Sequence, residues 1–122
     1  MIGRELLPEL RNSGYKFNEA SIVFVAKDKT NKLIWLEKGS NTAGLNHIVQ
    51  KHREDFRKAY GIDNSEIALY LYEAISNGDL DESKPSKIKG GYDRTYKYDS
   101  KYFTFVSIGD NGFIVTSFPT LK

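Results

Sequence analysis

The chain has 122 residues, of which 39% are hydrophobic and 28% are charged, and its formal net charge is +2. This balance is typical of a folded protein and excludes a disordered chain, and the length allows one hydrophobic core, so we expect a single domain over residues 1–122. The chain has no cysteine, which excludes disulfides, thiol catalysis and cysteine-ligated zinc. No apolar run approaches about 18 residues, so we expect no membrane anchoring.

The first part of the chain predicts a short helix followed by a β-hairpin. Residues 3–11 place three leucines on one side of a helix, with Pro8 close to its start. The runs SIVFVAK (21–27) and KLIWLEK (32–38) are rich in β-branched and aromatic residues and are separated by DKTN. This arrangement predicts two paired strands that are at least half buried.

A longer helix is expected over about 44–59. Its apolar residues recur at helical spacing, namely Leu45, Ile48, Val49 and Phe56. The preceding loop GSNTAG offers Asn41 or Thr42 as a cap for the helix start. Gly61 ends the pattern.

The second half predicts another helix and three strands. The helix follows Asp63 and ends at the pair Asn77–Gly78, after which residues 79–91 are expected to form a flexible loop. Three strand-like runs complete the chain: YDRTYKY, YFTFVSIG and FIVTSFP. Asp110, Asn111 and Gly112 join the last two runs in a hairpin turn. The order of elements indicates an α+β fold with an antiparallel sheet.

Charge is segregated along the chain. Residues 59–83 carry six acidic residues and no lysine or arginine, whereas residues 84–101 carry six basic residues and only two acidic ones. Such a division suits a basic surface that binds a polyanion, with the acidic part facing elsewhere. A solvated charged loop explains the same pattern equally well.

Both histidines of the chain lie in the stretch GLNHIVQKHREDF. At about 100° per residue, His52 falls within the apolar sector of the helix, whereas His47 points to nearly the opposite side. An undistorted helix is therefore expected to keep the two imidazoles apart. Lys51 lies one turn after His47, so a group that moves a proton and a cation that stabilises negative charge lie side by side.

Each histidine also has a structural interpretation. His52 is either a core histidine hydrogen-bonded to the backbone or an acid or orienting group in a cleft. His47 is either an exposed polar residue or, with Lys51, part of a site for phosphate chemistry. Helical zinc pairs use i, i+4 spacing, which these histidines lack, so we expect no metal and no cofactor.

The last strands supply further candidates. Alternation in FIVTSFP places Thr116 with Ile114 and Phe118, and Ser117 on the other face. Either hydroxyl is a hydrogen-bonding filler or a ligand for a phosphate oxygen. Aromatic and basic residues interleave nearby, which suits stacking of unpaired bases together with phosphate binding but also suits ordinary cross-strand pairing. The predicted RNA-binding residues are Lys89, Arg94, Tyr96, Lys97 and Tyr98.

The combination of LEKG, G-L-x-H-I-x-x-K-H and a final NGFIVTSFP resembles the BECR nuclease superfamily, which is named for barnase, EndoU, the tRNase colicins and RelE. Within it, the chain is similar to C-terminal toxin domains of bacterial polymorphic and contact-dependent growth inhibition systems. The resemblance implies helices packed on a four- to five-stranded antiparallel sheet and metal-independent cleavage of RNA, often transfer RNA. It assigns catalysis to His47, with Lys51 and His52 assisting and Thr116 and Ser117 completing the pocket.

The leading hypothesis is therefore an endoribonuclease toxin domain, delivered as part of a larger effector into the cytoplasm of a target cell. The resemblance also implies a cognate immunity protein or antitoxin. The alternative is a non-catalytic RNA- or protein-binding module of the same fold. A metal-dependent nuclease is a weaker third possibility.

Overall fold

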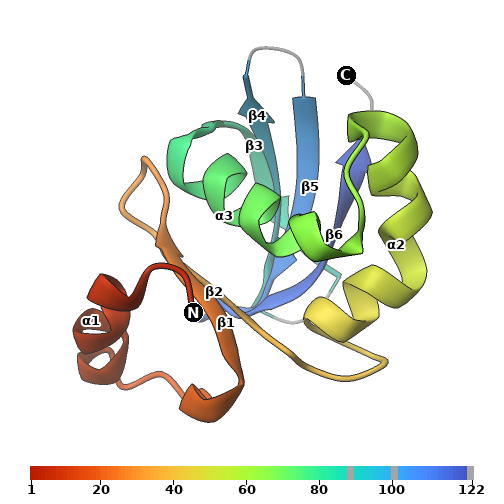
Figure 1. Ribbon diagram of the computed structural model, residues 1–122. Helices are drawn as coiled ribbons and strands as arrows, with labels where there is room; N and C mark the ends of the chain where they lie inside the picture. The colour runs from red at the N-terminus through yellow and green to blue at the C-terminus, as the bar shows by residue number, and fades with distance from the viewer. Residues whose placement is uncertain (88–89, 100–101, 121–122) are drawn as a thin grey trace.

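The computed structural model describes residues 1–87, 90–99 and 102–120. Short 3-10 turns precede the first strand and two of the helices (Figure 1). The helices are α1 (Leu7–Asn12), α2 (Leu45–Tyr60) and α3 (Ile67–Asn77). The strands are β1 (Ile22–Lys27), β2 (Leu33–Glu37), β3 (Asp79–Pro85), β4 (Tyr92–Tyr98), β5 (Tyr102–Ile108) and β6 (Ile114–Thr120).

The strands form a four-stranded antiparallel sheet and a separate hairpin. The sheet has the order β3-β4-β5-β6, so each strand pairs with its neighbour in sequence. The hairpin β1-β2 is the one that the sequence predicts. A single bridge between Trp35 and Phe113 connects it to the start of β6. The predicted α+β fold, with helices on an antiparallel sheet, is confirmed.

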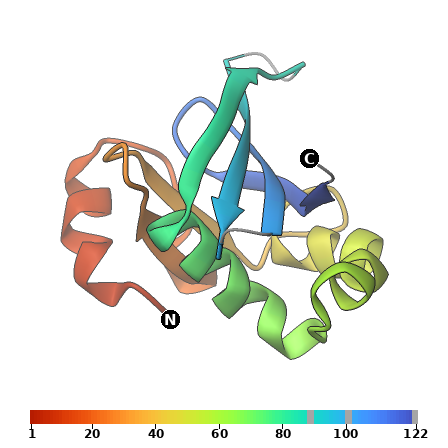
Figure 2. The same ribbon diagram turned by 90° about the horizontal axis from the view of Figure 1, so that it is seen from above.

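Helices α2 and α3 lie on the same side of the four-stranded sheet, with α3 over β4 and α2 beside β6 (Figures 1 and 2). The main core lies between them. It combines apolar residues of both helices with residues from the hairpin and the sheet, among them Phe56, Leu71, Tyr96 and Ile108, all fully buried. A second cluster surrounds Trp35 beneath α1. The side of the sheet that turns away from α2 and α3 is called the open face below.

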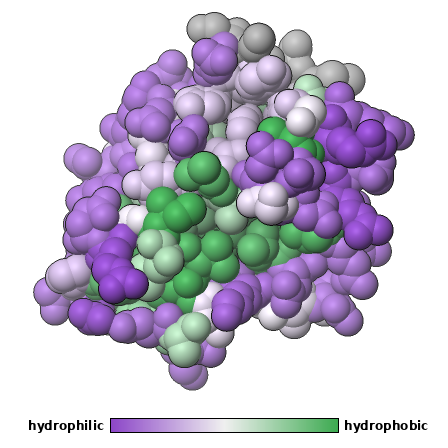
Figure 3. All heavy atoms as spheres, in the orientation of Figure 1, coloured by the Kyte–Doolittle hydropathy of each residue, from purple (hydrophilic) through white to green (hydrophobic). Residues whose placement is uncertain are grey.

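Apolar side chains also reach the surface on the helical side. Figure 3 shows a band of them over α3, where Leu69 is 50% exposed. Within the described residues, no helix combines the length and apolarity needed to cross a membrane.

The prediction that residues 79–91 form a flexible loop is wrong for the first half of this segment, because Asp79–Pro85 forms β3. Strand propensity is low here, yet the backbone pairs with β4 along its length, with one register shift. An edge strand tolerates charged residues and a terminal proline, because one side of its backbone faces solvent. The tertiary pairing therefore overrides the local signal. Residues 88–89 of the predicted loop lie outside the described residues.

Candidate functional site

A tight loop sets the start of α2. Gly39 and Gly44 have φ angles of 68° and 86°, in the left-handed region. A Cβ atom would lie 2.0 Å from the Ala43 carbonyl oxygen at Gly39, and 2.8 Å from the Glu37 carbonyl oxygen at Gly44, so only glycine fits at either position. The Gly44 N–H donates to the Val115 carbonyl at 3.0 Å, which fixes the start of α2 against β6.

The expected capping of α2 by Asn41 or Thr42 is wrong. Gly44 is the N-cap residue, and no side chain caps it. The backbone of Asn41 has a different role, since its carbonyl oxygen lies 2.9 Å from Nδ1 of His47. A carbonyl oxygen only accepts hydrogen bonds, so Nδ1 of His47 carries the proton and Nε2 has the free lone pair in the neutral ring.

His52 is held in the same tautomer by a carboxylate. Its Nδ1 lies 2.9 Å from Oδ2 of Asp55, three residues later on α2. The side chain of His52 is 23% exposed and that of Asp55 is 56% exposed. Asp55 is a candidate site residue to which the sequence assigned no role, although the i, i+3 spacing on a helix was the available signal. A carboxylate behind an imidazole fixes its orientation and stabilises the imidazolium.

The two imidazoles come together, contrary to the expectation from the helical wheel. Their ring centroids are 6.2 Å apart with an interplanar angle of 80°. The wheel fixes only the direction of each Cβ, whereas the side-chain torsions let the rings move across the helix surface. Here the Asn41 carbonyl positions the His47 ring, and Asp55 together with Phe118 positions the His52 ring.

Lys51 is exposed on α2, one turn after His47. Lys51 therefore follows His47 by one helical turn, as the sequence predicts. That the two residues act together on a phosphate group stays a prediction.

A register shift in β6 changes which residues face the helices. Ile108 pairs with Ile114, but Ser107 pairs with Thr116, so Val115 is the extra residue of a bulge. Ile114 therefore lies in the core, whereas Thr116 shares the open face with Phe118. The prediction that Ile114 and Thr116 share a face is wrong, because alternation fails across a bulge.

The two hydroxyls of β6 have different environments. Ser117 is fully buried on the helical side, and its Oγ donates to the Phe105 carbonyl at 2.7 Å. The prediction that Ser117 belongs to a phosphate pocket is therefore wrong, because its hydroxyl is buried and donates to the backbone instead. Thr116 differs, because its Oγ1 is buried without a hydrogen-bond partner among the described residues. It remains a candidate for binding a ligand.

Three phenylalanines form a row on the open face, namely Phe103, Phe105 and Phe118. Phe105 and Phe118 are cross-strand partners whose rings stack at 4.5 Å, with an interplanar angle of 17°. The ring of Phe118 lies 4.9 Å from that of His52. The Nζ of Lys97 lies 5.7 Å from the centroid of Phe103. The row thus begins at the histidines and ends beside a lysine, and the sequence reasoning did not identify it.

The predicted tyrosine strip on β4 is corrected by the structure. Tyr96 is fully buried, and its hydroxyl donates to Oδ2 of Asp28 at 2.6 Å. Burial and this hydrogen bond raise the pKa of Tyr96. Arg94 donates to the same oxygen at 2.7 Å, and its side chain is only 13% exposed. Neither residue is available to RNA, because the strand turns both side chains toward the core.

The other members of the strip separate by face. Tyr98 faces α3, where its hydroxyl donates to Glu73 at 3.1 Å. Lys97 is exposed on the open face and is the one described member that reaches the phenylalanine row. Lys89 lies outside the described residues.

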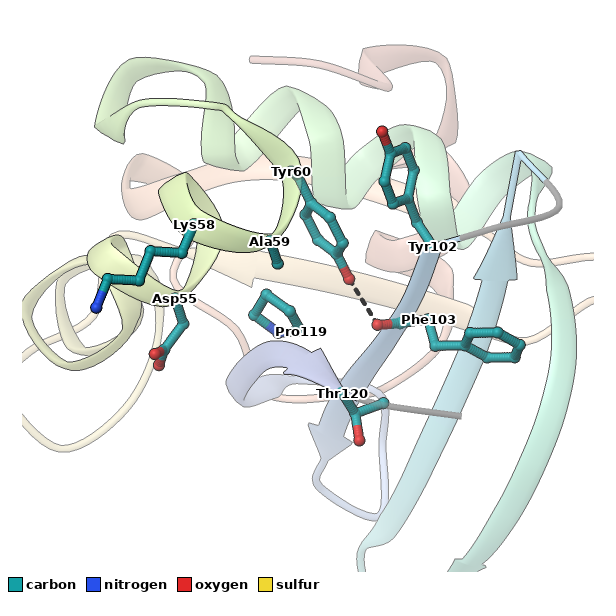
Figure 4. Close-up of a pocket in the computed structure, with 8 residues that line it drawn as sticks. All are labelled: Asp55, Lys58, Ala59, Tyr60, Tyr102, Phe103, Pro119 and Thr120. Atoms are coloured by element: carbon teal, nitrogen blue, oxygen red, sulfur yellow. Dashed lines mark hydrogen bonds between the residues drawn. The ribbon is translucent and has the colours of Figure 1, made fainter.

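A groove lies beside the C-terminal part of α2. It has a volume of about 500 Å³ and is lined by Asp55, Lys58, Ala59, Tyr60, Tyr102, Phe103, Pro119 and Thr120 (Figure 4). The hydroxyl of Tyr60 donates to the Phe103 carbonyl at 2.5 Å and so ties α2 to β5. Asp55 lines the groove and also contacts His52, so the groove lies next to the histidine pair.

Among the described residues, no three histidine, aspartate or glutamate side chains gather closely enough to hold a metal ion. Comparison with protein-family models finds no match to the chain, and comparison with curated proteins finds no significant match either.

Proposed function

We propose that the protein is a metal-independent endoribonuclease. The observation that carries the proposal is the pair of imidazoles, 6.2 Å apart, each with its Nδ1 committed to a hydrogen-bond acceptor. Both rings therefore offer Nε2 for proton transfer. One neutral and one protonated imidazole make up the base and the acid that cleavage of an RNA strand requires.

The reaction is a transfer of the phosphoryl group within the strand. The base takes the proton of a ribose 2′-hydroxyl, and the 2′ oxygen forms a bond to the adjacent phosphorus. The bond from phosphorus to the 5′ oxygen breaks, and the acid gives that oxygen its proton. The products are a 2′,3′-cyclic phosphate and a 5′-hydroxyl end.

Neighbouring groups assist each step. The Asp55 carboxylate stabilises His52 when it is charged, and the Asn41 carbonyl keeps the Nδ1 proton of His47 in place. The unpartnered hydroxyl of Thr116 is a donor for a phosphate oxygen, and Lys51 supplies a cation on the same helix.

The family resemblance extends the proposal. It supports transfer RNA as the substrate, a cognate immunity protein as the inhibitor, and a role as the toxin domain of a larger effector that acts in the cytoplasm of a target cell. The clustering of the histidines adds support for a nuclease and leaves these finer assignments to experiment.

The test compares His47→Ala and His52→Ala with the wild type on total RNA in excess EDTA. Each variant should cleave about 10²–10⁴-fold more slowly, because general acid–base catalysis contributes this much. Gln50→Ala, an exposed and uncharged residue on the same helix, is the matched control. The 3′ ends of the fragments should carry cyclic phosphate, and the unfolding temperatures should agree with the wild type.

Two results would contradict the proposal: full activity in both histidine variants, or loss of wild-type cleavage in EDTA. RNA binding without any cyclic phosphate would support the alternative, a non-catalytic binding module. The partly exposed phenylalanine row is the feature that favours this alternative.

A further inference from the structure

The groove beside the C-terminal part of α2 takes no part in the reaction proposed above, although it adjoins the histidine pair through Asp55. Its volume of about 500 Å³ lies within the range of roughly 300–1,000 Å³ that is usual for small-molecule sites. A space of this size suits one unit of a nucleic acid strand. A strand that passes the histidines is a ligand that can also reach the groove.

We propose that the groove is a subsite for a nucleotide that lies beyond the scissile bond on the same RNA strand, with Lys58 at the rim binding the phosphate of that nucleotide. The inference rests on the proposed function for the cleavage step. The subsite itself is a binding site, so it can be tested without cleavage.

The first argument is the lining of the groove. Ala59 and Tyr60 come from the end of α2, and Tyr102 and Pro119 come from the sheet, so most of the lining is apolar. Phe103 contributes mainly its backbone, because its ring points away from the other lining side chains (Figure 4). An apolar interior with a few polar groups at its margin is the usual lining of a small-molecule site, and it suits a nucleobase with its apolar ring and polar edge.

The second argument is that the walls of the groove are already fixed. The hydroxyl of Tyr60 donates to the Phe103 carbonyl at 2.5 Å and lies 2.9 Å from the hydroxyl of Thr104, which ties α2 to β5. Burial raises the pKa of Tyr60, so its hydroxyl keeps its proton and this bond at neutral pH. A site whose walls are in place before binding avoids the cost of ordering them.

The third argument is the position of two lysines on α2. Lys51 and Lys58 are exposed, and neither forms an ion pair with another described residue. At about 100° per residue, both fall on the side of the helix that carries His47. The ammonium group of Lys58 points away from the interior of the groove, toward its rim (Figure 4). Lysine binds phosphate as a point charge, so a strand that runs along this side of α2 meets a cation at the groove.

Two carboxylates on the same stretch of α2 would repel phosphate groups if they were free. Glu54 accepts a hydrogen bond from Arg57 at 2.6 Å, and Asp55 lies 2.9 Å from Nδ1 of His52. Each carboxylate is therefore held by a partner on its own helix. The lysines have no such partner among the described residues, so the balance of charge on this side of α2 favours a polyanion.

The spacing along α2 sets the length of the strand. His47 and Lys58 are eleven residues apart, which is roughly 16 Å along the helix axis at about 1.5 Å per residue. Consecutive phosphates of a nucleic acid strand lie closer together than this. A phosphate at the histidines and a phosphate at Lys58 are therefore separated by more than one nucleotide, so the substrate must extend past the two nucleotides that flank the scissile bond.

The experiment follows the binding of 2′-O-methyl oligouridylates to the wild type by NMR of the backbone amides. The methyl group blocks the attacking oxygen, so the ligand stays intact. The probes are a dinucleotide, which has a single phosphate, and a pentanucleotide. The pentanucleotide should bind at least about tenfold more tightly, because it adds phosphate contacts, and should shift the amide signals of Ala59 and Thr120. The dinucleotide should shift neither signal.

Substitutions in the groove sharpen the test. Lys58→Ala should weaken pentanucleotide binding several-fold and reduce the slope of log affinity against log salt by about 0.7, because one phosphate contact is lost, whereas Lys58→Arg should keep both. Ala59→Trp fills the groove and should weaken pentanucleotide binding without changing dinucleotide binding. The matched control is Lys16→Ala, which removes an exposed lysine between α1 and β1 and should bind both probes as the wild type does.

The outcomes separate the two proposals. Equal binding of the two probes, or unchanged pentanucleotide binding by both Lys58→Ala and Ala59→Trp, overturns the subsite even if the wild type cleaves RNA. Tighter pentanucleotide binding that both variants lose, without any cyclic phosphate from the wild type on total RNA, overturns the nuclease and keeps the subsite. No binding of either probe overturns the subsite and leaves the groove to a ligand other than RNA.

Discussion

The two faces of the four-stranded sheet use the same strands for different purposes. On the helical side, several polar groups inside the core are hydrogen-bonded, although Nε of Arg94 is buried without a partner among the described residues. Thr104 is fully buried, and its hydroxyl lies 2.9 Å from that of Tyr60 and 3.0 Å from that of Tyr70. Ser117 donates to a backbone carbonyl, and Tyr96 donates to Asp28. These three hydroxyls satisfy the requirement that buried polar atoms have partners.

The open face differs in its aromatic side chains. Three phenylalanine rings remain partly exposed, and the Thr116 hydroxyl has no partner among the described residues. Because side chains alternate along a strand, neighbouring residues such as Thr116 and Ser117 belong to different environments. Substitutions on the helical side should therefore change stability, and substitutions on the open face and at the histidines should change binding or catalysis.

The largest effect on stability is expected from Asp28→Asn, at about 3 kcal/mol at neutral pH. Asp28 is 3% exposed and accepts hydrogen bonds from Arg94 and Tyr96, so the substitution leaves a mostly buried guanidinium without its counter-charge. Denaturant unfolding measures the change. Glu5→Gln, at an exposed position, is the control and should leave stability within about 0.5 kcal/mol of the wild type.

The stability difference between Asp28→Asn and the wild type should also depend on pH. Burial alone would raise the pKa of Asp28, but hydrogen bonds from Thr30, Tyr96 and the backbone outweigh it and hold the pKa below its ordinary value of 3.8. The carboxylate therefore stabilises the fold above about pH 4, and this contribution is lost as the pH falls through the lowered pKa. The difference between wild type and variant should shrink in acid, and a constant difference would contradict this assignment.

A smaller effect, on activity alone, is expected from Asp55→Ala. Loss of the carboxylate that orients His52 should lower kcat about tenfold, or 1.4 kcal/mol, with KM unchanged. The effect is modest because Asp55 is exposed to solvent. Nitrogen NMR should show that the His52 ring no longer favours the Nδ1–H tautomer. Glu54→Ala, next to it on the helix, should change neither quantity.

The smallest effects come from the two hydroxyls of β6, and they should differ in kind. Ser117→Ala should destabilise the fold by about 1 kcal/mol, because it removes a buried hydrogen bond, and should leave cleavage unchanged. Thr116→Val should leave stability within about 0.5 kcal/mol of the wild type, because the hydroxyl it removes has no partner among the described residues, and should slow cleavage several-fold. If Ser117→Ala lost activity without losing stability, the division between the two faces would be wrong.

The sequence by itself determined the elements whose signals are local. The hairpin β1-β2, helices α2 and α3 and the last three strands follow from periodicity, turn residues and a glycine stop, all of which depend on near neighbours. It also marked the helix of His47 and His52 as the place to look for a site. These features were predictable because neighbouring residues suffice to set the local backbone conformation.

Only the tertiary structure decided which side chains meet. The two imidazoles converge because their hydrogen-bond partners select the side-chain torsions. The bulge at Val115 places Ile114 and Thr116 on opposite faces of the sheet, whereas simple alternation places them on the same face. Tyr96 does not lie on the predicted RNA-binding surface, because its hydroxyl donates to Asp28. The sequence did not indicate this contact, since Asp28 is 68 positions away. Strand β3 forms because β4 offers a backbone to pair with. Such contacts join residues far apart in the chain, and no local pattern records them.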